Sequence, residues 1–212
     1  MNLPNRITMF RVLLIPVFVV LLMLENILPY YNFIALAVFA AACFSDFLDG
    51  HIARKYNLVT TFGKFMDPLA DKILVSTALI LLIEFEKIPA VVVAVILARE
   101  FIISGFRLIA CDKGVVLAAG YLGKIKTFAQ MFMCCFMLFT ADRAYNKYLF
   151  FRIVDVVGQI FMWFALVMTV VSLVDYIWNN VDVLRDKKTD KVEVKKETKE
   201  AKAEEVAEKD AK

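Results

Sequence analysis

The sequence is poor in histidine, glycine and proline. One histidine in 212 residues argues against histidine-based metal sites and Ser-His-Asp triads. Seven glycines and five prolines are few for this length, which suits long helices. The four cysteines have no zinc-type spacing and lie in or beside apolar runs, so we interpret them as small buried hydrophobic residues. They are Cys43, Cys111, Cys134 and Cys135.

Apolar residues dominate the chain. They make up 61% of it, and the mean hydropathy is +0.68, whereas soluble domains are usually about 45–50% apolar. Since about 20 apolar residues cross a bilayer as a helix, the sequence predicts an all-α polytopic membrane protein with six transmembrane helices. The candidate spans are 7–25, 31–50, 66–86, 88–110, 120–140 and 152–178.

Lysine and arginine indicate how these spans are oriented. With the N-terminus in the cytoplasm, eleven basic residues of the membrane domain fall on the cytoplasmic side and four on the other side. We therefore expect both termini and the segment 45–72 to face the cytoplasm. Residues 1–180 form the predicted membrane domain. The segment 181–212 is predicted to be a charged, disordered tail, because its part from 186 on has nine lysines against nine acidic residues.

Four aspartates stand out near the end of the second predicted span and in the third. If both segments are helical, Asp46 and Asp49 share one helix face, and Asp67 and Asp71 lie one turn apart on the next helix. Four bare carboxylates in one small space repel one another, so protons or cations must accompany them. Carboxylate oxygens suit hard cations, and we predict two Mg²⁺ or Mn²⁺ ions of the kind that assist phosphoryl transfer.

The aspartates could instead pair with basic residues or carry a transported cation. Pairing needs four basic partners, and only Arg54, Lys64 and Lys72 are near. A cation transporter using the aspartates for Mn²⁺ or protons is a different class of function. Transporters commonly contain paired halves with interrupted helices, and the sequence has no such duplication.

The aspartates belong to a longer pattern, Asp46-x2-Asp49-Gly50-x2-Ala53-Arg54-x8-Gly63-x3-Asp67-x3-Asp71. This pattern resembles the complete signature of the CDP-alcohol phosphotransferase family. The resemblance implies a six-helix, usually homodimeric membrane enzyme that transfers the phosphatidyl group of a CDP-linked lipid to an alcohol and releases CMP.

The resemblance also implies roles for individual residues. Asp46, Asp49, Asp67 and Asp71 would bind the metals, and Asp71 would also act as the general base. The CDP site would be lined by Gly50, Ala53, Arg54 and Gly63. Thr8 and Arg11, three residues apart in the first span, would support the nucleotide site.

The stretch 99–127 is the best guide to the acceptor alcohol. It carries five basic residues against Glu100 and Asp112, and a phosphate-bearing alcohol would need such a focus of positive charge. Plain enrichment of basic residues on the cytoplasmic side is the competing explanation. The resemblance of this stretch to one branch of the family implies as candidates for binding the acceptor phosphate Arg107, Lys124 and Thr127, with Arg99 and Lys126 as weaker candidates.

This stretch and the opening "NLPNRITMFR" resemble one branch of the family, over about residues 2–178. The resemblance implies an enzyme of the bacterial cytoplasmic membrane with a cytoplasmic active site. It also implies CDP-diacylglycerol as the donor and glycerol 3-phosphate as the acceptor, with no nucleic acid partner. The alternative is a sister branch that uses serine, inositol or inositol phosphate.

Pro68 directly follows Asp67 and removes a hydrogen-bond donor to the carbonyl of Lys64. If the third helix starts just before Asp67, the proline costs little. If it starts earlier, we expect a kink at the site.

Overall fold

The computed structural model describes the backbone of residues 3–55, 61–112 and 120–180. Within these ranges it leaves the side chains of 3–7, 46–55, 61–65, 67, 68, 112, 143 and 146 undescribed. The described residues form helices and connecting turns, and no strand occurs among them, which confirms the predicted all-α class. The predicted tail, 181–212, lies outside the described residues. The elements are α1 Leu3–Met23, α2 Tyr31–Lys55, α3 Thr61–Glu84, α4 Ala90–Asp112, α5 Tyr121–Phe139, the 3-10 helix η1 Arg143–Lys147, and α6 Leu149–Asn180.

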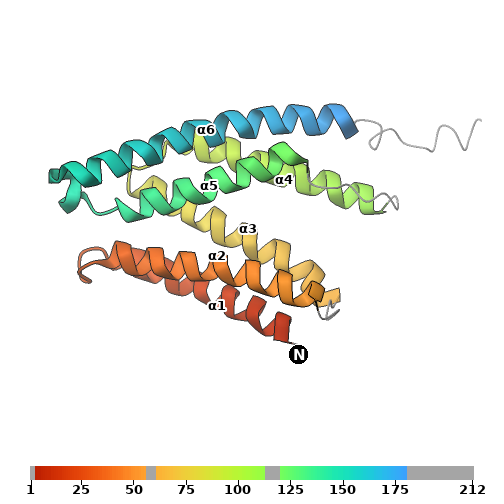
Figure 1. Cartoon of the computed structure of the whole chain (residues 1–212), viewed down its shortest axis with the longest axis horizontal. Coiled ribbons are helices and arrows are strands. Elements are labelled where there is room, and N and C mark those ends of the chain that lie inside the picture. The colour runs from red at the N-terminus through yellow and green to blue at the C-terminus, as the bar shows by residue number, and fades with distance from the viewer. Residues whose placement is uncertain (1–2, 56–60, 113–119, 181–212) are drawn as a thin grey trace, which may run out of the picture.

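The long helices lie lengthwise across the view, and successive helices run in opposite directions (Figure 1). The start of α1, the end of α2, the start of α3 and the end of α6 all lie at one end of the bundle, which we call the site end. The turn that follows α3 and the η1 helix lie at the opposite end, the far end. The first and last described helices therefore have their outer termini at the same end.

The six long helices match the six predicted segments with shifted boundaries. The two largest differences are equal: α3 begins at Thr61 rather than 66, and α2 continues to Lys55 rather than stopping at 50. Both extensions, HIARK in α2 and TFGKF in α3, mix polar with apolar residues, so neither continues an apolar run. As a result, every residue of the aspartate pattern lies on a helix.

A tight turn joins α3 to α4, as the "EFEKIP" sequence predicts. The N–H of Lys87 donates to the carbonyl of Leu82 over 3.0 Å, and the N–H of Glu86 donates to that of Ile83 over 2.9 Å. Glu86 has a φ of 56°, so these bonds form a Schellman cap on α3. The position usually holds glycine, because a side chain in the left-handed region is strained.

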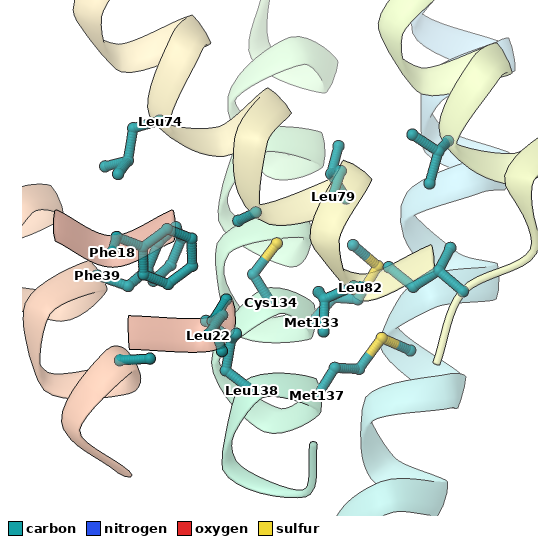
Figure 2. Packing of buried hydrophobic residues seen from close by; sticks show 14 of the residues in the cluster. Phe18, Leu22, Phe39, Leu74, Leu79, Leu82, Met133, Cys134, Met137 and Leu138 are labelled. Carbon is teal, nitrogen blue, oxygen red and sulfur yellow. The ribbon is translucent and has the colours of Figure 1, made fainter. Parts of the chain in front are cut away.

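The core is formed by α1, α2, α3, α4 and α5, together with Met162 of α6 (Figure 2). Phe18 of α1 and Phe39 of α2 are fully buried, with ring centroids 5.8 Å apart. Leu79 of α3 and Met133 of α5 fill the neighbouring space. The same side of α5 that carries Met133 also carries Gln130 and Lys126 toward the site end, so the core continues directly into a polar region.

Two of the described helices are long and apolar enough to cross a membrane by length and composition, namely Tyr121–Phe139 and Leu149–Asn180. Shorter apolar stretches occupy Thr8–Met23 and Tyr31–Ser45. α4 has the length, but Arg99, Glu100 and Arg107 interrupt its apolar run. The helical part of the prediction is therefore confirmed, and the number of helices that cross a membrane stays a prediction.

Candidate active site

The aspartate pattern spans the two helices that meet at the site end. Asp46, Asp49, Gly50, Ala53 and Arg54 belong to α2, and Gly63, Asp67 and Asp71 belong to α3. α2 and α3 contact each other, so the pattern is brought together from two neighbouring helices. Of these residues only Asp71 has a described side chain, and the other seven positions are known as backbone only.

Pro68 lies in the second turn of α3, because that helix begins seven residues before it, at Thr61. The carbonyl of Lys64 therefore lacks its usual helical donor. An early start of α3 is the condition under which a kink is expected, and this condition is met. The kink itself stays a prediction.

A cavity of about 380 Å³ lies beside Asp71. The described residues that line it come from α3, α4, α5 and α6. α3 contributes Asp71 and Lys72, and α4 contributes Arg99, Glu100, Ser104 and Arg107. The N-terminal end of α5, with the preceding Gly120, contributes Gly123, Lys124 and Thr127, and α6 contributes Ser172, Asp175 and Tyr176.

Four of the five residues predicted to bind the acceptor phosphate line this cavity. Arg107, Lys124 and Thr127 are exposed, whereas Arg99 is buried. The hydroxyl of Thr127 donates to the carbonyl of Gly123 over 2.9 Å, and its lone pairs remain able to accept a hydrogen bond. The structure thus brings the predicted general base and the predicted phosphate ligands to one space.

Lys126 differs from the other four. It is fully buried, it forms an ion pair with Glu100, and it is absent from the described residues that line the cavity. Its ammonium group is held by a carboxylate of the protein itself. We therefore interpret Lys126 as the counter-ion of Glu100.

Glu100 connects Lys126 to Arg99. Its Oε1 lies 3.5 Å from Nη1 of Arg99, and Nη2 of Arg99 donates to the hydroxyl of Ser172 on α6 over 3.0 Å. Gly123 of α5 leaves room for this guanidinium, because a Cβ at that position would lie 3.3 Å from Nη2. Charge pairing, one hydrogen bond and close approach to a glycine therefore hold Arg99 in one orientation.

A second set of polar contacts links α3 to α4. The ammonium of Lys72, next to Asp71 in the chain, donates to the hydroxyl of Ser104. That hydroxyl donates to the carbonyl of Glu100 over 2.5 Å. The helix that carries the predicted base is thereby tied to the helix that carries Arg99 and Arg107.

Sequence reasoning missed the contribution of α6. Ser172, Asp175 and Tyr176 follow a long apolar run and gave no pattern of their own. The signal that could have found them is the spacing of Thr169, Ser172 and Tyr176, which places three polar groups on one helix face. All three are buried, and buried polar groups normally have partners or a function.

Thr8 and Arg11 are buried in α1, which packs against α2 and α3. Neither is among the described residues that line the cavity. They lie on the helix that packs against both helices of the aspartate pattern, and not on the wall of the cavity. Their support of the nucleotide site stays a prediction.

Among the described side chains, no group of three or more His, Cys, Asp and Glu residues is arranged to hold a metal. Three of the four predicted metal ligands, Asp46, Asp49 and Asp67, fall outside that search because their side chains are undescribed.

Comparison with known proteins gives a consistent result. The model of the CDP-alcohol phosphatidyltransferase family matches residues 1–171. A Bacillus subtilis protein named CDP-diacylglycerol–glycerol-3-phosphate 3-phosphatidyltransferase is 40% identical over 195 residues, covering 87% of this chain and 97% of the relative. Proteins of the same name from Rickettsia typhi and Shigella flexneri serotype 5b are 38% and 35% identical. They cover 82% and 83% of this chain, and 94% and 93% of their own lengths are matched.

Proposed function

The chain belongs to the CDP-alcohol phosphatidyltransferase family, and we propose that it transfers the phosphatidyl group of CDP-diacylglycerol to glycerol 3-phosphate. The products are phosphatidylglycerophosphate and CMP, so the enzyme serves glycerophospholipid biosynthesis. The names of relatives that are 35–40% identical over most of the chain support both substrates.

The observation that carries the proposal is the composition of the cavity at the site end. The carboxylate of Asp71 lines a space that also contains Arg99, Arg107 and Lys124. A phosphate-bearing alcohol carries both a hydroxyl to be deprotonated and an anion to be bound. Charged donors bind phosphate oxygens about twice as strongly as neutral donors do, so this wall favours a phosphorylated acceptor over a neutral one.

The four aspartates of α2 and α3 fit divalent cations, since their donor set is entirely carboxylate and the two helices are in contact. Asp46, Asp49, Asp67 and Asp71 would hold two Mg²⁺ or Mn²⁺ ions. When bound, such ions neutralise the negative charge of a diphosphate and of the group in transfer.

The protein's own residues carry the remaining steps. Arg107, Lys124 and Thr127 bind the phosphate of glycerol 3-phosphate and direct its primary hydroxyl toward Asp71. The Asp71 carboxylate accepts the hydroxyl proton, and the hydroxyl oxygen forms a bond to the phosphorus that bears diacylglycerol. The bond from that phosphorus to the bridging oxygen breaks, and CMP leaves with this oxygen. Gly50, Ala53, Arg54 and Gly63 line the nucleotide site, with Thr8 in support.

All six long helices cross the cytoplasmic membrane in this proposal, with the site end in the cytoplasm and the chain as a homodimer. Large exposed side chains along α6, among them Ile160, Trp163 and Val167, suit contact with lipid. Exposed Tyr30 and Tyr148 at the far end suit the opposite membrane interface.

The test is an assay of the full-length protein in detergent with CDP-diacylglycerol, Mg²⁺ or Mn²⁺, and a panel of alcohols. The panel contains glycerol 3-phosphate, glycerol, serine, inositol and inositol phosphate, and the measured product is CMP. We expect CMP release with glycerol 3-phosphate, loss of release in excess EDTA, and recovery when Mg²⁺ or Mn²⁺ is restored.

Turnover of serine, inositol or inositol phosphate without turnover of glycerol 3-phosphate would replace the acceptor and keep the family chemistry. CMP release that persists after complete metal removal would contradict the metal assignment. Uptake of Mn²⁺ into vesicles without any CMP chemistry would instead support the transporter alternative.

A further inference from the structure

Two buried polar atoms in the wall of the site cavity have no hydrogen-bond partner within the described part of the protein. They are the hydroxyl of Tyr176 on α6 and Nε of Arg99 on α4. Tyr176 is 7% exposed and Arg99 is 8% exposed, and both residues line the cavity. Buried donors normally find partners, so two unpartnered donors on one cavity wall indicate a ligand that supplies acceptor oxygens.

We propose that Tyr176 is a specificity-determining residue that hydrogen-bonds the phosphate group of the acceptor, and that Ser172 is the positioning residue that aims Arg99 at the same group. The proposal rests on the proposed function and deepens it, because it adds α6 to an acceptor site so far assigned to α4 and α5.

The contacts of Arg99 explain why its Nε is left for a ligand. Nη2 donates to the hydroxyl of Ser172 over 3.0 Å, and Nη1 lies 3.5 Å from Glu100. The hydroxyl of Ser172 in turn donates to the carbonyl of Thr169 over 3.1 Å, which leaves its lone pairs for Arg99. The guanidinium is planar, so holding its two terminal nitrogens also fixes the direction of the Nε–H bond.

Arg107 and Tyr176 form a second contact between the same two helices. The guanidinium carbon of Arg107 lies 5.9 Å from the centroid of the Tyr176 ring, and Phe106 packs edge-on against that ring at 6.2 Å. These contacts hold the ring while its hydroxyl stays without a partner. Arg107 remains exposed and has its charged donors available for an anion in the cavity.

The charges around the cavity favour an anion. Among the described side chains, four cations line it, Lys72, Arg99, Arg107 and Lys124, against the carboxylates of Asp71, Glu100 and Asp175. The carboxylate of Glu100 forms an ion pair with Lys126, and that of Asp175 accepts a hydrogen bond from Asn179 over 3.0 Å. A phosphate monoester offers mainly acceptor oxygens at neutral pH, which matches two unpartnered donors beside a surplus of positive charge.

The test measures CMP release by Tyr176→Phe, which removes the hydroxyl and keeps the ring. We expect the KM for glycerol 3-phosphate to rise about tenfold or more, as for loss of a hydrogen bond to a charged group. The KM for CDP-diacylglycerol and the melting temperature should stay unchanged. Tyr148→Phe is the matched control, since Tyr148 is exposed at the far end, and it should leave every parameter unchanged.

Ser172→Ala tests the positioning role. Without the hydroxyl, Arg99 loses one of the two contacts that orient it, so the KM for glycerol 3-phosphate should rise several-fold while kcat stays within about twofold. The two variants should also reduce the preference for glycerol 3-phosphate over glycerol, measured as the ratio of the two kcat/KM values.

An unchanged KM for glycerol 3-phosphate in Tyr176→Phe would overturn the proposal while leaving the proposed function intact. A rise confined to the KM for CDP-diacylglycerol would also overturn it, because the hydroxyl would then bind the donor diphosphate. If the wild-type protein instead uses inositol phosphate, the proposed function fails, and a raised KM for inositol phosphate in Tyr176→Phe still supports the proposal. Use of unphosphorylated acceptors alone would overturn both.

Discussion

The ammonium group of Lys126, fully buried on α5, is held by the carboxylate of Glu100 on α4. Replacing Glu100 with Gln leaves this cation without its counter-charge, and we expect a loss of about 3 kcal/mol in the free energy of unfolding. The double variant Glu100→Gln/Lys126→Met should recover most of that loss. Thermal unfolding in detergent measures all three variants, and additive effects of the two substitutions would contradict a paired role.

Asp71→Asn should lower kcat by about 10³-fold or more, because the amide cannot accept the hydroxyl proton. Binding of CDP-diacylglycerol, measured by equilibrium titration, should be largely retained. Asp142→Asn makes the same chemical change at the far end, where Asp142 caps η1, and should keep turnover close to wild type. Near-normal turnover of Asp71→Asn would show that another group is the base.

Gly123→Ala should weaken acceptor binding, because the added Cβ would stand 3.3 Å from Nη2 of Arg99 and push it from Ser172. We expect the KM for glycerol 3-phosphate to rise about three- to tenfold, a cost of about 1 kcal/mol. Gly105→Ala on α4 is the matched control, since nothing lies within 4 Å of its added Cβ. If the two variants have the same KM for glycerol 3-phosphate, the Arg99 side chain can move aside without weakening acceptor binding, and its orientation does not matter.

Asp155 should matter for stability rather than for catalysis. At the far end its carboxylate accepts hydrogen bonds from Lys87 over 2.7 Å, Thr140 over 3.0 Å and Gln159 over 3.0 Å. These contacts join the α3–α4 turn, the end of α5 and α6. Asp155→Ala should lower the free energy of unfolding by about 2 kcal/mol, because the nearly buried ammonium of Lys87 loses its partner.

The kinetic constants of Asp155→Ala separate stability from catalysis. Both KM values should match those of the wild type at temperatures where the variant is folded. A raised KM for glycerol 3-phosphate in Asp155→Ala would indicate coupling between the far end and the site end.

The helices, and the cavity residues on α3, α4 and α5, were predictable because the sequence patterns that mark them are local. Apolar runs mark helices, and a spacing of four places Gly63, Asp67 and Asp71 on one face of α3. The basic residues of 99–127 were recognised as a group because they lie close in sequence. What was missed is non-local. Whether Lys126 faces the cavity or Glu100 depends on how α4 packs near α5, and spacing within one helix carries no such information.

The predicted helix boundaries were wrong for a related reason. Apolar runs end where a chain leaves an apolar environment, but helical hydrogen bonds continue as long as the backbone permits. α2 therefore extends to Lys55 and α3 starts at Thr61, through mixed polar and apolar residues that remain helical. Hydropathy alone does not fix the number of membrane-crossing helices for the same reason, since the charges within α4 interrupt its apolar run.

The length of α6 matters for the proposed membrane arrangement. Its 32 residues measure about 48 Å, against about 30 Å for the hydrocarbon core of a bilayer. In the proposed orientation, a crossing that begins at Leu149 would use roughly two thirds of the helix. Ser172 and Tyr176 would then lie beyond the acyl chains. A water-soluble alcohol phosphate would reach them from the aqueous side, while the lipid donor would approach from within its own leaflet.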